Sequence, residues 1–346
     1  MEKRPTIMDI ARVAGVSFKT VSRVLNGNSS VGSELRDRVL KASAELNYRP
    51  NLAARSLAST RHHAIAMVIG KETMEYASSE GWYLPPFVMD FQARALVACQ
   101  QRGYRFHIEI VDETSSSLAM QLSAQQLHVD GIILAPPLAD SATVMEALEQ
   151  NALPYVRVSP GLEIDRTSAV MVDEYGGAFA MTEYLLSLGH RRIGFIHGHP
   201  DHLAAKRRYV AFHDAMSASQ ETEELTEIGS FTFAGGWGAA EKLLAREQPP
   251  TAIFAANDEM AAGVVAAAFN CGIGVPNGLS VAGFDDSPYA RLTPVPLTTV
   301  NQPIADMVEA TIAMLIGEKG PSGVGDQLRL PCKVIERSST RPFARS

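Results

Sequence analysis

The 346-residue chain has few cysteines and no long apolar run. Cys99, Cys271 and Cys332 lie far apart and outside any C-x-x-C pair, which argues against a disulfide framework or a cysteine zinc site and predicts three buried thiols. No stretch approaches 18 consecutive apolar residues, and the start MEKRPTIMDI lacks the apolar segment of a secretory signal, so we expect a cytoplasmic protein. The sequence also lacks a P-loop, a nucleophile elbow and a G-x-G-x-x-G after a strand.

Positive charge is scarce overall but concentrated at one end. The formal net charge of -7 would normally argue against nucleic-acid binding. Residues 1–62, however, hold 11 basic and 5 acidic residues, a net +6, which leaves 20 basic and 33 acidic residues, a net -13, for the remainder. Such asymmetry predicts a nucleic-acid module joined to a different domain.

The first 50 residues predict short helices. Thr6 can cap a first helix that ends at Gly15, and Ser17 can cap a second that runs to Asn26. Apolar spacing predicts a third helix, with Leu35, Val39, Ala42 and Leu46 on its inner face. In the first two helices, a small residue, a turn glycine and apolar anchors have helix-turn-helix spacing: Ala11, Gly15, Val16, Val21 and Val24. An ordinary helical hairpin without a ligand is the alternative, and the basic charge argues against it.

From Ala64 onward, continuous apolar runs alternate with helical patterns. The strand candidates begin at Ala64, Gly131, Arg192, Thr251 and Leu279, and CKVIE near the end is the last. Buried runs separated by helices predict parallel sheets in an α/β fold. About 280 residues is long for one doubly wound sheet, so we expect two lobes.

The segments TIMDIARVAGVSFKTVSRVLNG and ELNYRPNLAARSLA resemble the start of LacI/GalR-type transcriptional regulators, and the similarity extends over essentially the whole chain. The resemblance implies a helix-turn-helix domain over residues 1–50 and a hinge helix and linker over 51–62. It implies a periplasmic-binding-protein-like effector and dimerisation domain over 63–341. The N-lobe would take about 63–171 and 302–330, and the C-lobe about 172–300 and 331–341.

For DNA binding, the resemblance places Thr6 at the DNA backbone and a set of residues on the recognition helix: Ser17, Phe18, Lys19, Ser22, Arg23 and Asn26. Lys19 and Arg23 can donate to guanine and Phe18 can contact a thymine methyl, although Arg23 on a phosphate is the alternative. Asn51, Arg55 and Leu57 fall on the hinge helix, where a leucine corresponding to Leu57 would enter the minor groove. One departure is Val31-Gly32-Ser33, which loses or shifts a capping hydroxyl.

For effector binding, the resemblance assigns Arg208, Asn257, Asp285 and Phe231. Asn257 follows the run TAIFAA and Asp285 follows LSVAGF, and ligands of such sheets bind outside the carboxyl ends of strands. A guanidinium, an amide and a carboxylate beside an aromatic face suit the vicinal hydroxyls of a sugar, although helix capping is the alternative for Asn257 and Asp285. Trp82 and Tyr83 could stack on a pyranose or merely cover the core. His202 is a further candidate ligand contact.

A competing motif is H-x-H-x-D-H, formed by His197, His199, Asp201 and His202. These residue types can hold zinc and activate a water in metal-dependent hydrolases. The alternating strand and helix context is wrong for that class, so we expect no metal site. A periplasmic sugar receptor is disfavoured by the basic start and by the lack of a signal segment.

The sequence therefore predicts a non-enzymatic repressor without a cofactor. We expect a homodimer on a near-palindromic operator, controlled by a sugar, with a purine-type corepressor as the alternative effector. The absence of a heptad tail after CKVIE favours a dimer over a tetramer.

Overall fold

The computed structural model describes residues 5–25, 31–48, 61–71, 84–200, 202–317 and 325–343. The chain divides into two units, Met1–Arg61 and His62–Ser346. Predictions for seven residues lie outside the described ranges: Asn26, Asn51, Arg55, Leu57, Trp82, Tyr83 and Asp201. None of the described helices is long and apolar enough to cross a membrane.

Over residues 5–25 and 31–48, the first unit contains three helices, α1 (Ile7–Ala14), α2 (Phe18–Leu25) and α3 (Ser33–Glu45). Thr6 and Asp9 form a reciprocal capping box at the start of α1, and Gly15 ends that helix with φ 60° in the left-handed region. The Ser17 hydroxyl accepts the Thr20 amide at 3.1 Å, which caps α2. The predicted caps are therefore confirmed. The small core consists of Ile10, Ala14, Val21, Val24, Val39 and Ala42.

Two details of this unit differ from the prediction. Leu35 is 38% exposed, because the inner face of α3 is formed by Val39 and Ala42 instead. Val16 is only half-buried at the edge of the core. Gly32 is the N-cap of α3 and supplies no side-chain hydrogen bond, as expected for a glycine where related sequences have a capping serine.

The second unit contains two lobes. The strands of the first lobe are β1 (Ala64–Gly70), β2 (Arg105–Val111), β3 (Gly131–Leu134), β4 (Tyr155–Val158), β5 (Ala169–Val172) and β11 (Gln327–Leu330). They form a parallel sheet in the order β11-β5-β4-β3-β1-β2. Every residue of β1 is buried, as a central parallel strand requires.

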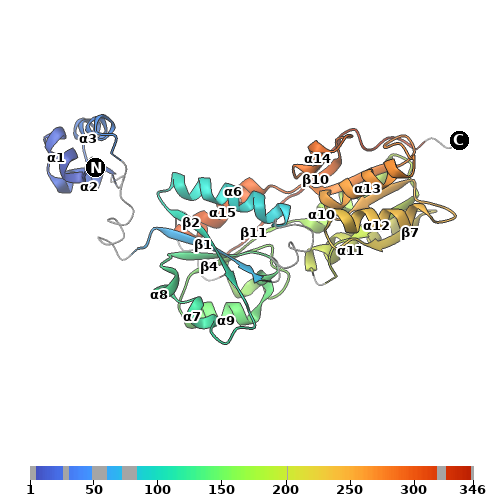
Figure 1. The fold of residues 1–346 in the computed structure, drawn as a ribbon, viewed down its shortest axis with the longest axis horizontal. Helices are drawn as coiled ribbons and strands as arrows, with labels where there is room; N and C mark the ends of the chain where they lie inside the picture. Colours follow the sequence, from blue (N-terminus) through green and yellow to red (C-terminus); the bar gives the residue numbers. More distant parts are fainter. Residues whose placement is uncertain are drawn as a thin grey trace. The chain divides into compact units, whose positions relative to one another are not determined.

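Helices cover both faces of this first sheet (Figure 1). The helical segments are α6 (Pro86–Gln101), α7 (Leu118–Gln121), α8 (Ala124–Leu127), η1 (Leu138–Asp140), α9 (Ala142–Gln150), η2 (Ile164–Arg166) and α15 (Ile304–Ile316). Side chains of α6 and α15 bury one face with Ile65 and Met67, and those of α7 and α9 bury the other with Ala66 and Val68. Successive side chains of β1 point to opposite faces of the sheet, so this strand contributes to the apolar core on each face.

The strands of the second lobe are β6 (Arg192–His197), β7 (Glu223–Ile228), β8 (Ala252–Ala255), β9 (Ser280–Asp285), β10 (Thr298–Asn301) and β12 (Lys333–Ile335). Their order is β12-β10-β9-β8-β6-β7, and only β12 is antiparallel. The helices are α10 (Glu174–Ser187), α11 (Leu203–Ser217), α12 (Phe233–Leu244), α13 (Asp258–Asn270) and α14 (Tyr289–Leu292). In the core, Phe195 stacks on Phe212 and meets the ring of Phe254 edge-to-face.

The chain passes between the lobes three times. It leaves the first sheet after β5 and enters α10, returns from β10 into α15, and leaves again from β11 into β12. The segments at the first two passages bring Glu174 and Gln302 to the boundary between the lobes. All six predicted strand segments are present, and the predicted two-lobed α/β fold is confirmed.

The three cysteines do not share one environment. Cys99 is buried, and burial raises the pKa of its thiol to about 11. Cys332 is half-buried and Cys271 is exposed at the end of α13. The prediction of three buried thiols is therefore confirmed for Cys99 and wrong for the half-buried Cys332 and for Cys271, where the helix has left the core.

Candidate functional site

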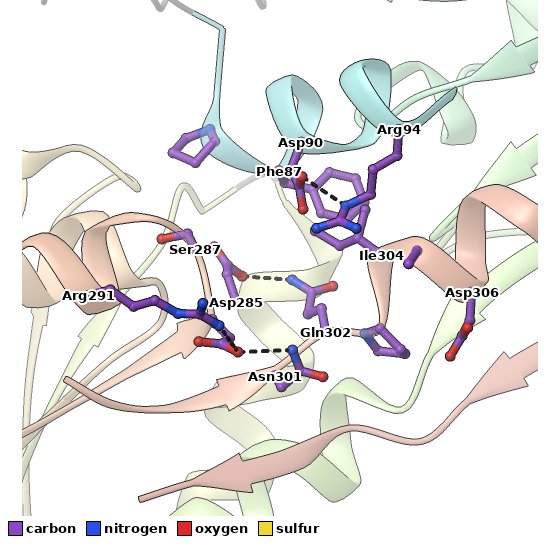
Figure 2. Close-up of a pocket in the computed structure, with 14 residues that line it drawn as sticks. Phe87, Asp90, Arg94, Asp285, Ser287, Arg291, Asn301, Gln302, Ile304 and Asp306 are labelled. Atoms are coloured by element: carbon purple, nitrogen blue, oxygen red, sulfur yellow. Dashed lines mark hydrogen bonds and ion pairs between the residues drawn. The ribbon is translucent and has the colours of Figure 1, made fainter. Parts of the chain in front are cut away.

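A pocket of about 330 Å³ lies between the two lobes of the second unit (Figure 2). Phe87, Asp90 and Arg94 on α6 line it from the first lobe. The second lobe contributes Asp285 at the end of β9, followed by Asp286 and Ser287, and the end of β10 and the passage into α15 contribute Asn301, Gln302 and Ile304. The pocket thus lies at the carboxyl ends of two parallel strands, where ligands of open α/β sheets bind.

Two adjacent carboxylates dominate the second-lobe side of this pocket. Asp285 has φ 116° and Asp286 has φ 56°, values that non-glycine residues rarely adopt. Gln302 donates to Asp285 Oδ1 at 2.6 Å, while Asp286 accepts from Asn301 at 3.2 Å and Arg337 at 2.5 Å. These bonds hold the strained turn in place, so its two carboxylates are preorganised.

Arg208 on α11 lies directly behind Asp285. Its Nη1 is 3.5 Å from Asp285 Oδ1 and donates to the Ala256 carbonyl at 2.6 Å. Its Nη2 donates to Glu174 Oε1 at 3.4 Å, and the guanidinium stacks 3.8 Å above the ring of Phe284. Arg208 is only 5% exposed, so a fully desolvated cation is held between two carboxylates.

A third carboxylate is buried beneath the turn. Asp258 is completely buried, accepts the Thr299 hydroxyl at 2.5 Å and accepts the Ser287 amide at 2.7 Å. Burial, reinforced by the negative charge of Asp285, raises the pKa of Asp258 well above its usual range. Burial also raises the pKa of Asp285 to about 6, although the nearby Arg208 opposes this shift.

The structure places the other predicted effector residues around this cluster rather than in the pocket. Asn257 caps α13 by accepting the Met260 amide at 2.9 Å, and it donates to the Phe231 carbonyl at 3.1 Å. The capping alternative is therefore the observed role of Asn257. The Phe231 ring covers Gly198, and its centroid is 5.5 Å from that of His202. Of the predicted effector residues that the structure describes, only Asp285 lines the pocket.

Most residues at this boundary were not predicted, among them Phe87, Glu174 and Gln302. Gln302 comes just after β10, and the position after a parallel strand is the signal that identified Asp285. Glu174 likewise comes two residues after β5. Neither strand was among the predicted apolar runs, so the residues after them were missed.

The recognition-helix candidates lie on α2 with a clear division of faces. Val21 and Val24 are buried, whereas Phe18 is 50% exposed and Lys19 and Arg23 are exposed. The Ser17 hydroxyl contacts that of Thr20 at 2.9 Å, and the Thr6 side chain is engaged by Asp9. A half-exposed aromatic together with two exposed cations is suited to contacts with base edges and phosphates.

The histidine-rich loop does not form a metal centre in the described part of the chain. The ring of His197 lies 4.4 Å from that of Tyr209, and burial lowers its pKa. The rings of His199 and His202 are 6.1 Å apart. Among the described residues, no group of three or more histidine, cysteine or acidic side chains is placed to hold a metal ion.

Comparison with known proteins agrees with both units. Residues 6–51 match the family model for bacterial regulatory proteins of the lacI family, and residues 182–340 match a periplasmic binding protein-like domain. The HTH-type transcriptional regulator CelR of Thermobifida fusca is 31% identical over 334 residues, which cover 95% of this chain and 95% of CelR.

Two solved structures extend this comparison. A transcriptional regulator CelR–cellobiose complex is 31% identical, has a TM-score of 0.68, and is matched over 97% of this chain and 100% of that chain. The lac repressor dimer bound to operator and the anti-inducer ONPF is 26% identical, with a TM-score of 0.70 and coverage of 98% and 100%. The chain therefore belongs to the LacI family and is a transcriptional repressor with an effector-binding domain, not an enzyme.

Proposed function

We propose that the protein is a homodimeric repressor of a near-palindromic operator and that a sugar bound between its lobes controls DNA binding. The observation that carries this proposal is the interlobe pocket, whose wall contains Asp285 backed by buried Arg208. An effector there touches both lobes, so its binding energy can change how the lobes are held together. Release of the operator is the response we expect.

The chemistry of the pocket favours a sugar. Asp286 and Asn301 offer an acceptor and an amide, Gln302 offers a second amide, and Phe87 adds an aromatic ring. Sugar hydroxyls donate and accept, and the apolar face of a sugar ring packs on aromatic groups. CelR, which is similar over most of this chain, has been solved with cellobiose.

The charge distribution supports DNA binding by the first unit alone. Residues 1–62 carry a net +6, which can displace counterions from the duplex, whereas the remainder carries -13. We assign operator reading to residues 1–50, with Phe18, Lys19 and Arg23 at its centre. Residues 51–62, with Leu57, would be the hinge, and residues 63–341 would be the effector and dimerisation domain.

Exposed apolar side chains on the second unit support a homodimer. Phe269 on α13 is 85% exposed and Leu292 on α14 is 80% exposed, and these two helices pack together. On the first lobe, Leu96 and Val97 of α6 are about half exposed, at 51% and 52%. Where exposed apolar side chains gather into a contiguous patch, they commonly mark a contact surface. The lac repressor was solved as a dimer on its operator, and we propose the same assembly for this chain.

Calorimetry and operator binding test the proposal together. The full-length protein should bind a neutral sugar from a panel that includes cellobiose and ribose, and that sugar should weaken binding to the operator selected by the protein from random duplexes. Hypoxanthine and guanine form the comparison arm. If a purine binds tightly and strengthens the operator complex, the effector is a purine-type corepressor and the sugar assignment is wrong.

A further inference from the structure

We propose that Glu174 is a specificity-determining residue of the interlobe site and that it restricts the effector to uncharged sugars, excluding sugar phosphates and other anions. This inference rests on the proposed function, because it takes the interlobe boundary as the place where the effector binds. Beyond the proposed function, it specifies that the ligand is uncharged and names a residue that selects for this.

Glu174 is a buried carboxylate with one unused oxygen. It is the first residue of α10, at the first passage between the lobes, and is 3% exposed. Oε1 accepts from Arg208 Nη2 at 3.4 Å, and Oε2 lies 3.8 Å from Arg207 Nη1. Oε2 accepts no hydrogen bond from any residue that the structure describes. A buried acceptor without a donor costs free energy, so a ligand that supplies a donor gains from it.

The partner of Glu174 has a matching unused donor. Both Nη atoms of Arg208 are engaged, by Ala256, Asp285 and Glu174. The Nε of Arg208 is buried and, within the described part of the chain, has no acceptor. One ion pair therefore presents one free donor and one free acceptor. A hydroxyl group can satisfy either atom because it both accepts and donates, whereas a phosphate dianion only accepts and cannot satisfy Glu174 Oε2.

The charges around this ion pair disfavour an anion. Arg208 lies between Glu174 and Asp285, and Arg207 Nη1 lies 3.8 Å from Glu174 Oε2, so these four groups carry no net positive charge when both carboxylates are ionised. The arginines that line the pocket are also paired, Arg94 with Asp90 at 2.9 Å and Arg291 with Asp286 at 3.5 Å. A phosphate would have to break one of these pairs or approach the carboxylates. Like-charge contacts of this kind are strongly unfavourable away from water.

The test compares matched ligands on three forms of the full-length protein. Titration calorimetry would use neutral sugars, including cellobiose and ribose, each paired with its phosphorylated form. The wild type should bind its neutral sugar about 100-fold more tightly than the phosphorylated partner. In Glu174→Gln the side-chain size is kept but the charge is lost, and the ratio should fall about tenfold. Glu174→Asp should keep the preference while weakening both ligands.

The control is Glu183→Gln, an exposed glutamate on the same helix. The ratio of the two affinities is unaffected by a general loss of stability, so it separates ligand selection from folding. An unchanged ratio in Glu174→Gln would overturn the role of Glu174. Equal or tighter binding of the phosphorylated sugar by the wild type would show that the effector is not restricted to uncharged sugars. The proposal of a sugar-controlled repressor would still stand. If no sugar of either kind binds, the sugar effector of the proposed function fails, and this inference fails with it.

Discussion

Arg207 Nη2 donates a hydrogen bond of 3.1 Å to the carbonyl oxygen of Gly161 and so joins the two lobes. Its Nη1 donates to the Pro160 carbonyl at 3.3 Å. Gly161 lies so close to Leu203 that a Cβ on the glycine would be 2.1 Å from the leucine Cδ1. On the first lobe, the Asp140 carboxylate accepts the Gly161 amide at 2.7 Å. Groups of both lobes therefore hold this contact in place: Arg207 and Leu203 from the second lobe, and Asp140 from the first.

We predict that Arg207→Ala loosens this contact. Two hydrogen bonds from a charged group are lost, and Glu174 loses a nearby cation. The side chain is 30% exposed, so the expected loss in the free energy of unfolding is modest, about 1–2 kcal/mol. Urea denaturation followed by fluorescence measures this loss.

Lys206→Ala is the matched control, because Lys206 is the preceding residue on α11 and is exposed. It should change the free energy of unfolding by less than about 0.5 kcal/mol. Equal effects of the two substitutions would contradict a specific role for Arg207.

A second prediction concerns pH. Burial raises the pKa of Asp285 to about 6, above the usual value of about 3.9, so the folded protein binds this proton more tightly than the unfolded chain does. The stabilisation from protonated Asp285 is therefore fully present below pH about 4 and is lost as the pH rises to about 6. Asp285→Asn should remove this part of the pH dependence, which urea denaturation at pH 4, 5, 6 and 7 would show.

Asp306→Asn provides the control for that series, because Asp306 lines the same pocket but is exposed. Arg208, Glu174 and Glu259 also act on Asp285, and the comparison with wild type leaves these groups in place. If the difference in unfolding free energy between wild type and Asp285→Asn does not change between pH 4 and 6, the assignment to Asp285 is wrong.

The third prediction is that Phe18→Ala weakens operator binding without unfolding the first unit. Phe18 is 50% exposed and lies outside the apolar core of that unit, so its removal leaves the packing intact. A lost base contact costs about 1–3 kcal/mol, which corresponds to about 5-fold to 150-fold in affinity. Fluorescence anisotropy with labelled operator measures this loss. Met8→Ala, at a residue that is 62% exposed on α1, should bind the operator as wild type does.

A fourth prediction addresses the dimer. Leu292→Asp places a charge on an apolar side chain that is 80% exposed in the single chain, so the monomer should remain folded. If Leu292 is buried between two copies, the dimer dissociation constant should rise about tenfold or more. Sedimentation velocity over a concentration series measures it. Met120→Asp, at a residue that is 67% exposed on α7, is the control, and an equal effect there would argue against the proposed surface.

The elements that could be predicted from the sequence are those with local signals. The run from Ala64 is buried at every position, and the caps at Thr6 and Ser17 act within three residues, so neither depends on distant contacts. The edge strands β2 and β7 carry mixed sequences, RFHIEIV and EELTEI, because much of each strand is half-buried or exposed. Their apolar pattern is too weak to distinguish them from loops.

The candidate site could be predicted only in part, for a related reason. Asp285 follows an obvious strand, and its position after that strand indicated its role. Glu174 and Gln302 become part of the site because two separate passages of the chain between the lobes meet there, where Glu174 pairs with Arg208 and Gln302 pairs with Asp285. Asn257 has a residue type suited to ligand binding, but its side chain is used to cap α13 and to hold the Phe231 carbonyl. Sequence cannot show which polar groups are already occupied.

The three passages between the lobes also have a consequence for the nascent chain. On the first lobe, the sheet face with Ile65 and Met67 is covered by α6 and α15, and α15 follows nearly all of the second lobe in the sequence. During synthesis the part of this face under α15 therefore stays open until residues beyond 312 have emerged from the ribosome, and β11 must follow to complete the sheet edge. Exposed apolar surface of this kind promotes aggregation. The interleaved order thus makes the first lobe, although it is translated earlier, complete its fold only after most of the second.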